Sequence, residues 1–276
     1  MTKVYVSIDM EGVAGIASPD QVLPGRLHYL EGRRLMTAEA NAVALGCFEA
    51  GVAEVLVNDS HGPMDNLLGE DLDPRVEYLV GTPKRYAMVD QLDGSFDAMM
   101  LIGYHVDGSS VDGVLAHCYS GAAFAEVRLN GAPASELELN ALVAGLHGVP
   151  VVLVSGDSQT CDLAAKSLPG VGTVAVKTGL GFRAARTLTP VAARDRLRQA
   201  AAEAVASISD RPVPVVPDRL TLEVTLRAPG AAEYAGLVPG TQRIAAADLR
   251  RDCADPLELL DILQTWGRLS AAYASA

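Results

Sequence analysis

The opening stretch of the chain, MTKVYVSIDMEGVA, constrains the fold more than any other segment. Residues 3–8 are typical of a buried strand, and Asp9 and Glu11 follow where that strand ends. In α/β proteins, ligands gather outside the carboxyl ends of parallel strands. Because Asp9 and Glu11 are two residues apart, extended backbone points both carboxylates to one side, where they repel unless a cation lies between them. The pair predicts a metal site, although taken alone it also fits a turn capped by Asp9 with Gly12 and a solvated Glu11.

Composition narrows the class of protein. The chain has 276 residues, of which 49% are hydrophobic, which is ample for a packed core. Its 34 acidic and 22 basic residues give a net charge of -12, which argues against nucleic acid or an anionic membrane as a partner. The sequence shows no leader segment and no apolar run approaching the roughly 18 residues of a membrane span, so we expect a cytoplasmic protein. The cysteines lack CxxC spacing, which predicts neither disulfides nor a thiolate zinc site.

Alternating strand and helix patterns predict the fold class. The expected strands cover 3–8, 54–57, 76–80, 97–102, 150–155 and 171–176, and the expected helices between and after them cover 27–49, 83–92, 135 onward, 162–168 and 189–208. We further expect a hairpin turn at Asn130 and Gly131, a capping box formed by Ser135 and Glu138, and a short strand at 114–116. This βα alternation predicts a three-layer α/β fold with a largely parallel sheet flanked by helices.

A change of composition near residue 210 predicts a boundary. The segment 210–218 contains three prolines, which is typical of a linker. Beyond it we expect strands at 220–226 and 243–246 and helices at 231–235 and 256–272. We therefore divide the chain into an α/β catalytic domain, 1–209, and a smaller C-terminal α+β subdomain, 210–276.

Three of the five histidines follow predicted strands. His61, His105 and His117 each have polar or glycine neighbours there, whereas His28 and His147 lie in or at the ends of helices, where we expect structural or exposed roles. A single loop histidine is weak evidence for function, since imidazoles often satisfy ordinary loop hydrogen bonds. Three at strand ends, together with the acidic pair, strengthen the prediction of a metal site.

Carboxylates and imidazoles are ligands that zinc accepts, and paired zinc ions about 3.5–4 Å apart commonly share a carboxylate and a water. Two ions need about five protein ligands. Asp9, Glu11, His61, His105 and one further carboxylate would supply them, with a metal-activated water as the nucleophile. Periodicity and spacing do not identify the fifth carboxylate.

Several short motifs occur along the chain in a fixed order. They are 7–12 (SIDMEG), 34–37 (RLMT), 39–41 (EAN), 57–61 (VNDSH), 103–105 (GYH), His117, 135–141 (SELELNA), 148–150 (GVP) and 239–241 (PGT). In order and spacing, the set resembles the zinc D-aminopeptidase family named after the DppA protein of dipeptide-transport operons. The resemblance implies two zinc ions per subunit, with Asp9 bridging both ions.

The resemblance also assigns the remaining site residues. It implies that Glu11, His61, His105 and Glu136 complete the metal coordination and that His117 is catalytic, most naturally as a general base or acid. The capping-box role of Glu138 leaves Glu136 free to bind metal. The same ligands would accept manganese or cobalt.

The implied activity is hydrolysis of the N-terminal amide bond of short peptides, with D-amino-acid peptides as typical substrates. The alternatives are a dinuclear-metal amidase acting on L-peptides, peptidoglycan fragments or other small amides, and a metal-dependent binding protein without hydrolysis. A nucleotide-binding protein is disfavoured, because 179–181 (GLG) is an isolated fragment of the glycine fingerprint. The resemblance also implies a ring-shaped homo-oligomer, a decamer, that encloses the active sites.

Three features depart from the family pattern. The segment between His105 and His117 is slightly longer, and 118–123 (CYSGAA) is smaller and less aromatic, so we expect a different substrate pocket. Asp157 is followed by Ser158 where the family pattern has a second acidic residue. Because the implied metal ligand set is complete without Asp157, we expect this residue to have a structural role or to support the ligands from behind.

Overall fold

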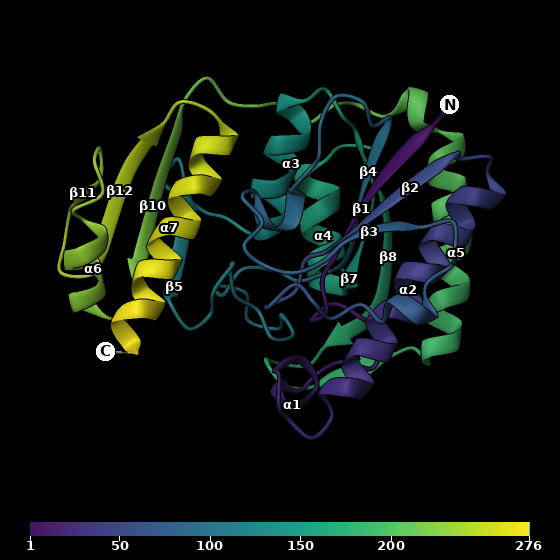
Figure 1. The fold of residues 1–276 in the computed structure, drawn as a ribbon, viewed down its shortest axis with the longest axis horizontal. Helices are drawn as coiled ribbons and strands as arrows, with labels where there is room; N and C mark the ends of the chain where they lie inside the picture. Colours follow the sequence, from purple (N-terminus) through teal and green to yellow (C-terminus); the bar gives the residue numbers. More distant parts are fainter. Residues whose placement is uncertain (276) are drawn as a thin grey trace.

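Two sheets organise the computed structural model, which describes residues 1–275 (Figure 1). Within those residues the first sheet has seven strands, in the order β3 (Glu77–Leu79), β2 (Glu54–Asp59), β1 (Lys3–Ile8), β4 (Ala98–Tyr104), β7 (Val151–Asp157), β8 (Gly172–Gly179) and β9 (Ala185–Thr187). Neighbouring strands are parallel except for β9, which runs antiparallel to β8. The prediction of a largely parallel sheet is confirmed.

Helices cover both faces of this sheet (Figure 1). One face carries α2 (Tyr29–Glu49) and α5 (Pro190–Ala206), with the short α1 (Pro19–Val22) nearby, and the other carries α3 (Glu136–Leu146) and α4 (Ser158–Ser167). Alternation along β1 explains the two cores, since Val4 and Val6 join the core under α2 and α5 while Tyr5 joins the core under α3. The three-layer prediction is therefore confirmed. None of the helices in residues 1–275 has the length and apolar character that crossing a membrane requires.

The second sheet is antiparallel and lies beside the first (Figure 1). Within residues 1–275 it has five strands, in the order β11 (Gln242–Arg243), β12 (Asp248–Cys253), β10 (Leu220–Leu226), β5 (Phe124–Leu129) and β6 (Ala132–Pro133), and it is accompanied by α6 (Pro229–Ala235) and α7 (Pro256–Ala274). Trp266 of α7 is fully buried in the same core as Leu137 of α3. The sheet thus combines C-terminal strands with β5 and β6 from before the predicted boundary at residue 210. That boundary stays a prediction.

The order of the strands creates a switch point beside β1. From β1 the chain builds outward to β2 and β3 on one side and to β4, β7 and β8 on the other, and such a point is where α/β folds bind ligands. There Asp9 N donates to Ile102 O at 2.8 Å and Gly12 N donates to Gly103 O at 2.7 Å. A Cβ on Gly12 would lie 2.0 Å from Tyr104 O, so this close approach requires glycine. The loop after β1 is held against the end of β4.

Several local predictions are confirmed. Asn130 and Gly131, with φ of +52° and +84°, form the turn between β5 and β6. Ser135 caps α3, and its backbone N–H donates to Glu138 Oε2 at 3.0 Å in a full capping box.

Two predicted elements are wrong, and the strand expected at 243–246 is only the short β11, Gln242–Arg243. The helix expected at 83–92 is only the short 3₁₀ turn η2 (Ala87–Val89), because Ala87 and Gln91 have φ of +46° and +63° and do not continue a helix. The strand expected at 114–116 is a turn in which Leu115 has a φ of +53°. Two further 3₁₀ turns, η1 (Gly69–Asp71) and η3 (Ile208–Asp210), connect longer elements.

The helix expected at 162–168 begins earlier, at Ser158. Asp157 caps it by accepting hydrogen bonds from the backbone N–H and the hydroxyl of Thr160, both at 2.8 Å. Its other carboxylate oxygen accepts from Val114 N at 2.9 Å. Asp157 therefore has the structural role predicted for it.

Candidate metal centre

All six predicted site residues converge at the carboxyl edge of the first sheet. They come from the loop after β1 (Asp9, Glu11), the end of β2 (His61), the end of β4 (His105), the loop before β5 (His117) and the first residue of α3 (Glu136). The three carboxylates, His61 and His105 are all at most 6% exposed. Residues separated by more than a hundred positions thus form one buried polar cluster.

His61 joins the two carboxylates of the first loop. Its Nδ1 lies 3.1 Å from Asp9 Oδ1 and 2.8 Å from Glu11 Oε2. The contact with Glu11 is an ion pair without hydrogen-bond geometry, since Glu11 Oε2 has no hydrogen-bond partner among residues 1–275. His61 Nε2 lies 2.7 Å from Val22 O, which fixes the ring from its other side. The imidazole therefore presents Nδ1 to the carboxylates.

His105 lies between Asp9 and Glu136. Its Nε2 is 3.3 Å from Asp9 Oδ2 and 3.5 Å from Glu136 Oε2. The opposite ring nitrogen, Nδ1, lies 2.9 Å from Val106 O and donates to it. Metal-ligating histidines usually donate their other ring nitrogen in this way, so the orientation of His105 fits a metal ligand.

His117 forms the solvent side of the cluster. Its ring stacks on that of His105, with centroids 4.3 Å apart and an interplanar angle of 17°. Its Nδ1 lies 2.9 Å from Leu115 O, and its Nε2 lies 4.0 Å from Glu136 Oε1. The His117 side chain is 25% exposed, against 1% for His105. His117 is thus the histidine of the cluster that a ligand in the adjoining cavity can reach.

Burial and mutual repulsion perturb the acidic pair. Burial, followed by the charge of Glu11, raises the pKa of Asp9 to about 7. Burial opposes ionisation of Glu11 as well, but contact with His61 holds its pKa well below the usual range. Burial would lower the pKa of His61, yet Glu11 and Asp9 together hold it well above the usual range. In the metal-free protein, protons on this group of residues balance the excess of negative charge.

The other two histidines shift in opposite directions. Burial lowers the pKa of His105, but the carboxylates of Glu136 and Asp9 outweigh it and raise the value to about 9. Burial and the neighbouring charge of His105 lower the pKa of His117. His117 is therefore neutral near pH 7 and able to accept a proton.

The donors fit a divalent cation. Among residues 1–275, Asp9 Oδ2, Glu11 Oε2 and His105 Nε2 are buried and lack a hydrogen-bond partner. Such atoms are costly to bury unless they are paired or coordinate a metal. Ligand atoms of Asp9, Glu11 and His105 all lie within 4.8 Å of one another, and so do those of His105, His117 and Glu136. Oxygen and imidazole donors of this kind suit zinc.

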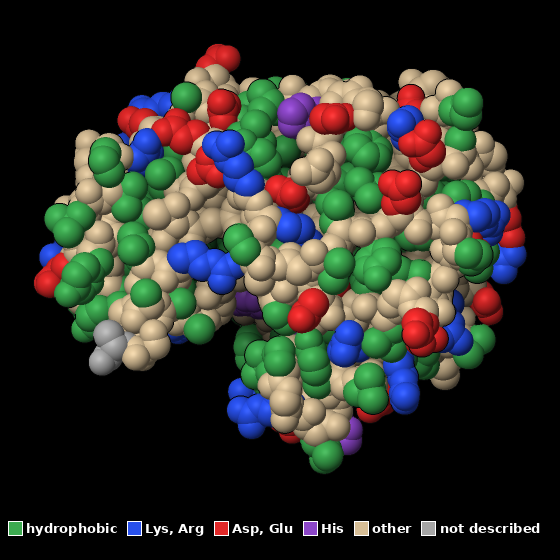
Figure 2. Space-filling view, viewed as in Figure 1, with side chains coloured by type: hydrophobic (Ala, Val, Ile, Leu, Met, Phe, Trp, Pro, Cys, Tyr) green, Lys and Arg blue, Asp and Glu red, His purple; other side chains and the backbone are tan. Residues whose placement is uncertain are grey.

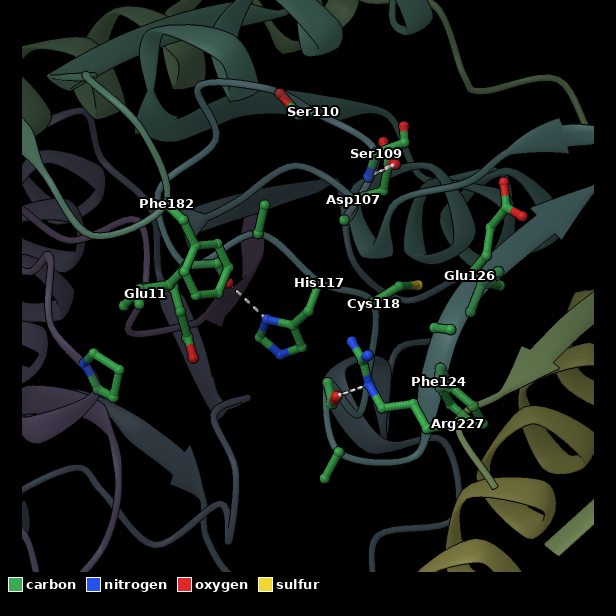
Figure 3. Close-up of a pocket in the computed structure, with 18 of the residues that line it drawn as sticks. Glu11, Asp107, Ser109, Ser110, His117, Cys118, Phe124, Glu126, Phe182 and Arg227 are labelled. Atoms are coloured by element: carbon green, nitrogen blue, oxygen red, sulfur yellow. Dashed lines mark hydrogen bonds between the residues drawn. The ribbon is translucent and has the colours of Figure 1, made fainter. Parts of the chain in front are cut away.

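The cluster opens into a cavity of about 780 Å³. Glu11 and His117 line it, together with Phe182 of the β8–β9 turn and Arg227 after β10 (Figure 3). Figure 2 shows the surface hollowed between the part that carries α6 and α7 and the part that carries α1. A pocket of this size accommodates a small organic ligand.

A buried hydrogen-bond network supports the cluster from behind. Tyr104 OH bonds to Ser7 Oγ at 2.7 Å and accepts from Asn140 Nδ2 at 2.9 Å. Tyr119 OH in turn donates to Asn140 Oδ1 at 2.7 Å, and Tyr119 N donates to Glu136 Oε1 at 2.5 Å. The network ties the His117 loop to β1, β4 and α3.

Two further residues support the loop after β1, and the sequence prediction missed the role of both. Lys177 of β8 is 3% exposed, and its Nζ donates to the carbonyl oxygens of Glu11, Val13 (3.0 Å) and Ile16 (2.6 Å). Glu39 of α2 is 2% exposed, and its Oε1 accepts from Ala14 N at 2.9 Å. Lys177 directly follows the strand predicted at 171–176, and this position is the signal that could have revealed its role.

Comparison with known proteins identifies the family. The profile of the M55 peptidase family, described as D-aminopeptidase, matches residues 2–265. The chain belongs to this family.

Two relatives agree with the family assignment. A D-aminopeptidase from Bacillus subtilis (strain 168) is 38% identical over 241 residues, which cover 87% of each chain. A solved structure, the Zn-dependent D-aminopeptidase DppA from Bacillus subtilis, described as a self-compartmentalizing protease, superposes with a TM-score of 0.93 at 34% identity over 98% of each chain. The fold predicted from sequence is therefore that of the D-aminopeptidase family.

The remaining predicted residues lie outside the cluster. His28 is exposed, with its Nδ1 3.5 Å from Glu31 Oε2, and His147 follows the end of α3. Both have the structural or exposed positions predicted for them.

Replacing Lys177 with Met tests how the loop after β1 is held. This loop, residues 9–16, carries Asp9 and Glu11 and is called the metal loop below. The variant leaves three buried carbonyls without their donor, so we expect its affinity for zinc to fall by about 10- to 100-fold, a range typical of lost outer-shell partners, with a lower melting temperature. Zinc titration calorimetry and thermal unfolding measure both effects, with exposed Lys166→Met as the matched control. Unchanged zinc affinity in K177M would show that the lysine does not position the loop.

Replacing Glu39 with Gln tests its buried carboxyl. Burial raises the pKa of Glu39 to about 7, above its ordinary value of 4.5, although Ala14 N–H and Lys177 oppose the shift. The folded state therefore holds this proton more tightly than the unfolded state, and the stability it contributes is lost as pH rises from about 4.5 to 7.

We expect the free energy of unfolding of E39Q, relative to wild type, to rise between pH 5 and pH 8 by on the order of 3 kcal/mol. Urea unfolding of the metal-free protein measures this difference, and Glu31→Gln on the exposed side of α2 is the control. A pH-independent difference would contradict the shifted titration.

Proposed function

We propose that the protein is a metal-dependent aminopeptidase that hydrolyses the N-terminal amide bond of short peptides containing D-amino acids. The observation that carries the proposal is the buried cluster of three carboxylates and three histidines, of which Glu11 and His117 line the adjoining cavity. The names of the two relatives support the stereochemistry and the use of zinc. The alternative substrates are L-peptides, peptidoglycan fragments and other small amides.

The proposed metal site holds two zinc ions. Asp9 would be shared by both ions, because its two carboxylate oxygens face His61 and His105 separately. Glu11 and Glu136 complete the set. Zinc, when bound, polarises the scissile carbonyl and makes a water molecule nucleophilic near neutral pH.

His117 is the proposed catalytic residue. The hydrogen bond from Nδ1 to Leu115 O leaves Nε2 as the free acceptor on the cavity side. The depressed pKa keeps this nitrogen unprotonated, so it can take the proton of the attacking water and return it to the leaving amine.

The oligomeric state of the protein is also a proposal. The description of the related structure as self-compartmentalizing supports a closed ring of subunits, and we propose a decamer. The domain boundary at residue 210 and the cytoplasmic location stay predictions.

The experiment compares D-Ala-D-Ala, L-Ala-L-Ala and a non-peptide amide, each with and without a chelator. We expect the D-dipeptide to be cleaved fastest, activity to disappear with the chelator and zinc to restore it. His117→Ala should lower kcat by at least about 100-fold, as loss of a general base does, while the zinc content is retained. The control variant His28→Ala, which removes an exposed histidine directly before α2, should have the activity and zinc content of the wild type.

Equal or faster cleavage of the non-peptide amide would contradict the aminopeptidase assignment. Hydrolysis that survives His117→Ala would contradict the catalytic role.

A further inference from the structure

Two oppositely charged side chains that line the cavity lie on opposite sides of His117. In Figure 3, His117 lies between Glu11, which belongs to the metal loop, and Arg227, which follows β10. Glu11 is thus held by the first sheet and Arg227 by the second.

One side-chain hydrogen bond orients the guanidinium of the exposed residue Arg227. Its Nε donates to Gly121 O at 2.6 Å, and its backbone N donates to Ala123 O at 2.9 Å. The register between β10 and β5 shifts between Thr225 and Leu226, directly before this residue. Irregularities of this kind re-aim the side chains that follow them.

Gly121 connects the guanidinium to His117. A Cβ on Gly121 would lie 3.4 Å from His117 Cβ and 3.5 Å from the ring atom Cδ2. The carbonyl that holds Arg227 is therefore part of the residue that packs against the histidine. Movement of one would displace the other.

The charge of Arg227 is unmatched. Among residues 1–275 it forms no ion pair, and its terminal nitrogens make no hydrogen bond. The acidic residues that share the cavity are occupied elsewhere, since Glu126 pairs with Arg128 at 2.8 Å and Asp107 accepts from Ser109 N at 2.8 Å. The two terminal nitrogens, Nη1 and Nη2, are free of partners in the described part of the chain, and a carboxylate can accept two parallel N–H···O hydrogen bonds from them.

We propose that Arg227 binds the C-terminal carboxylate of the substrate and so selects short peptides with a free carboxyl end. The inference rests on the proposed function. With the peptide amino terminus at the metal loop and the scissile amide beside His117, the other charged end of a short peptide faces Arg227. Amidation of the peptide's C-terminus removes its negative charge. In a longer peptide, the C-terminal carboxylate lies beyond the reach of the Arg227 guanidinium.

Arg183 provides a matched control. It lines the same cavity from the β8–β9 turn, but its guanidinium lies over the ring of Phe182, 5.9 Å from the centroid. It has no contact with the His117 loop comparable to the bond between Arg227 and Gly121. Replacing it changes the charge of the cavity by the same amount without touching the proposed subsite.

The experiment measures kcat/KM for one D-dipeptide with a free carboxylate and for its C-terminal amide. We expect wild type to prefer the free carboxylate by about 10- to 100-fold, the range for a charge-assisted hydrogen bond, and Arg227→Gln to abolish that preference mainly by raising KM. Arg227→Lys should recover part of it, and Arg183→Gln should keep the wild-type ratio.

Binding measurements test the subsite without turnover. Calorimetry compares a non-hydrolysable reduced-amide dipeptide with its C-terminal amide, on wild type and on R227Q. If wild type binds the carboxylate form more tightly than the amide and R227Q does not, the subsite is supported, even when the corresponding D-dipeptides are not cleaved. The absence of cleavage would overturn only the proposed function. Equal binding of both forms by wild type, or an equal loss for both in R227Q, would overturn the inference.

Discussion

The structure depends on keeping three carboxylates, Asp9, Glu11 and Glu136, buried around His105. Like charges at such distances in a low-dielectric interior repel strongly, so the group must take up protons or a cation. The raised pKa of Asp9 is the metal-free expression of that constraint. Glu136 gains additional support from its position in the first turn of α3, where the helix dipole favours an anion.

The scaffold holds these charges from several directions. Glycine at position 12 lets the loop after β1 lie directly against β4, and Lys177 reaches from β8 to bind three carbonyls of the same loop. The network through Tyr104 and Asn140 extends this support to the His117 loop. Lys177 therefore stabilises the folded state, because the three buried carbonyl oxygens would lack a hydrogen-bond donor without it.

Sequence reasoning predicted the parallel sheet and the residues that meet at its edge, because polar residues placed directly after apolar strands mark that edge. Glu136 was predicted from the family resemblance, because the spacing of residues in the sequence does not show that the start of α3 lies beside the loop after β1. The turn before His117 was mistaken for a strand because Leu115 adopts a left-handed conformation that an apolar sequence does not signal. Lys177 and Arg227 escaped notice because each acts through contacts with residues more than a hundred positions away.

The two sheets divide the work of the site. The first sheet, together with α3, positions the proposed metal ligands, and the second sheet supplies one wall of the cavity through β5 and the end of β10. Because the same core packs against both sheets, the wall and the metal ligands keep a fixed relation to one another. Substrate selection can therefore change through the second sheet while the metal ligands stay in place.

Anomalous diffraction from crystals of the zinc-loaded protein, with metal analysis of the same sample, is the most direct test of a shared carboxylate. The account predicts two ions per chain, both in contact with Asp9, and the loss of both ions in Asp9→Asn but not in Asp107→Asn, which removes a nearby cavity carboxylate. A single ion, or two ions that are retained in Asp9→Asn, would contradict it.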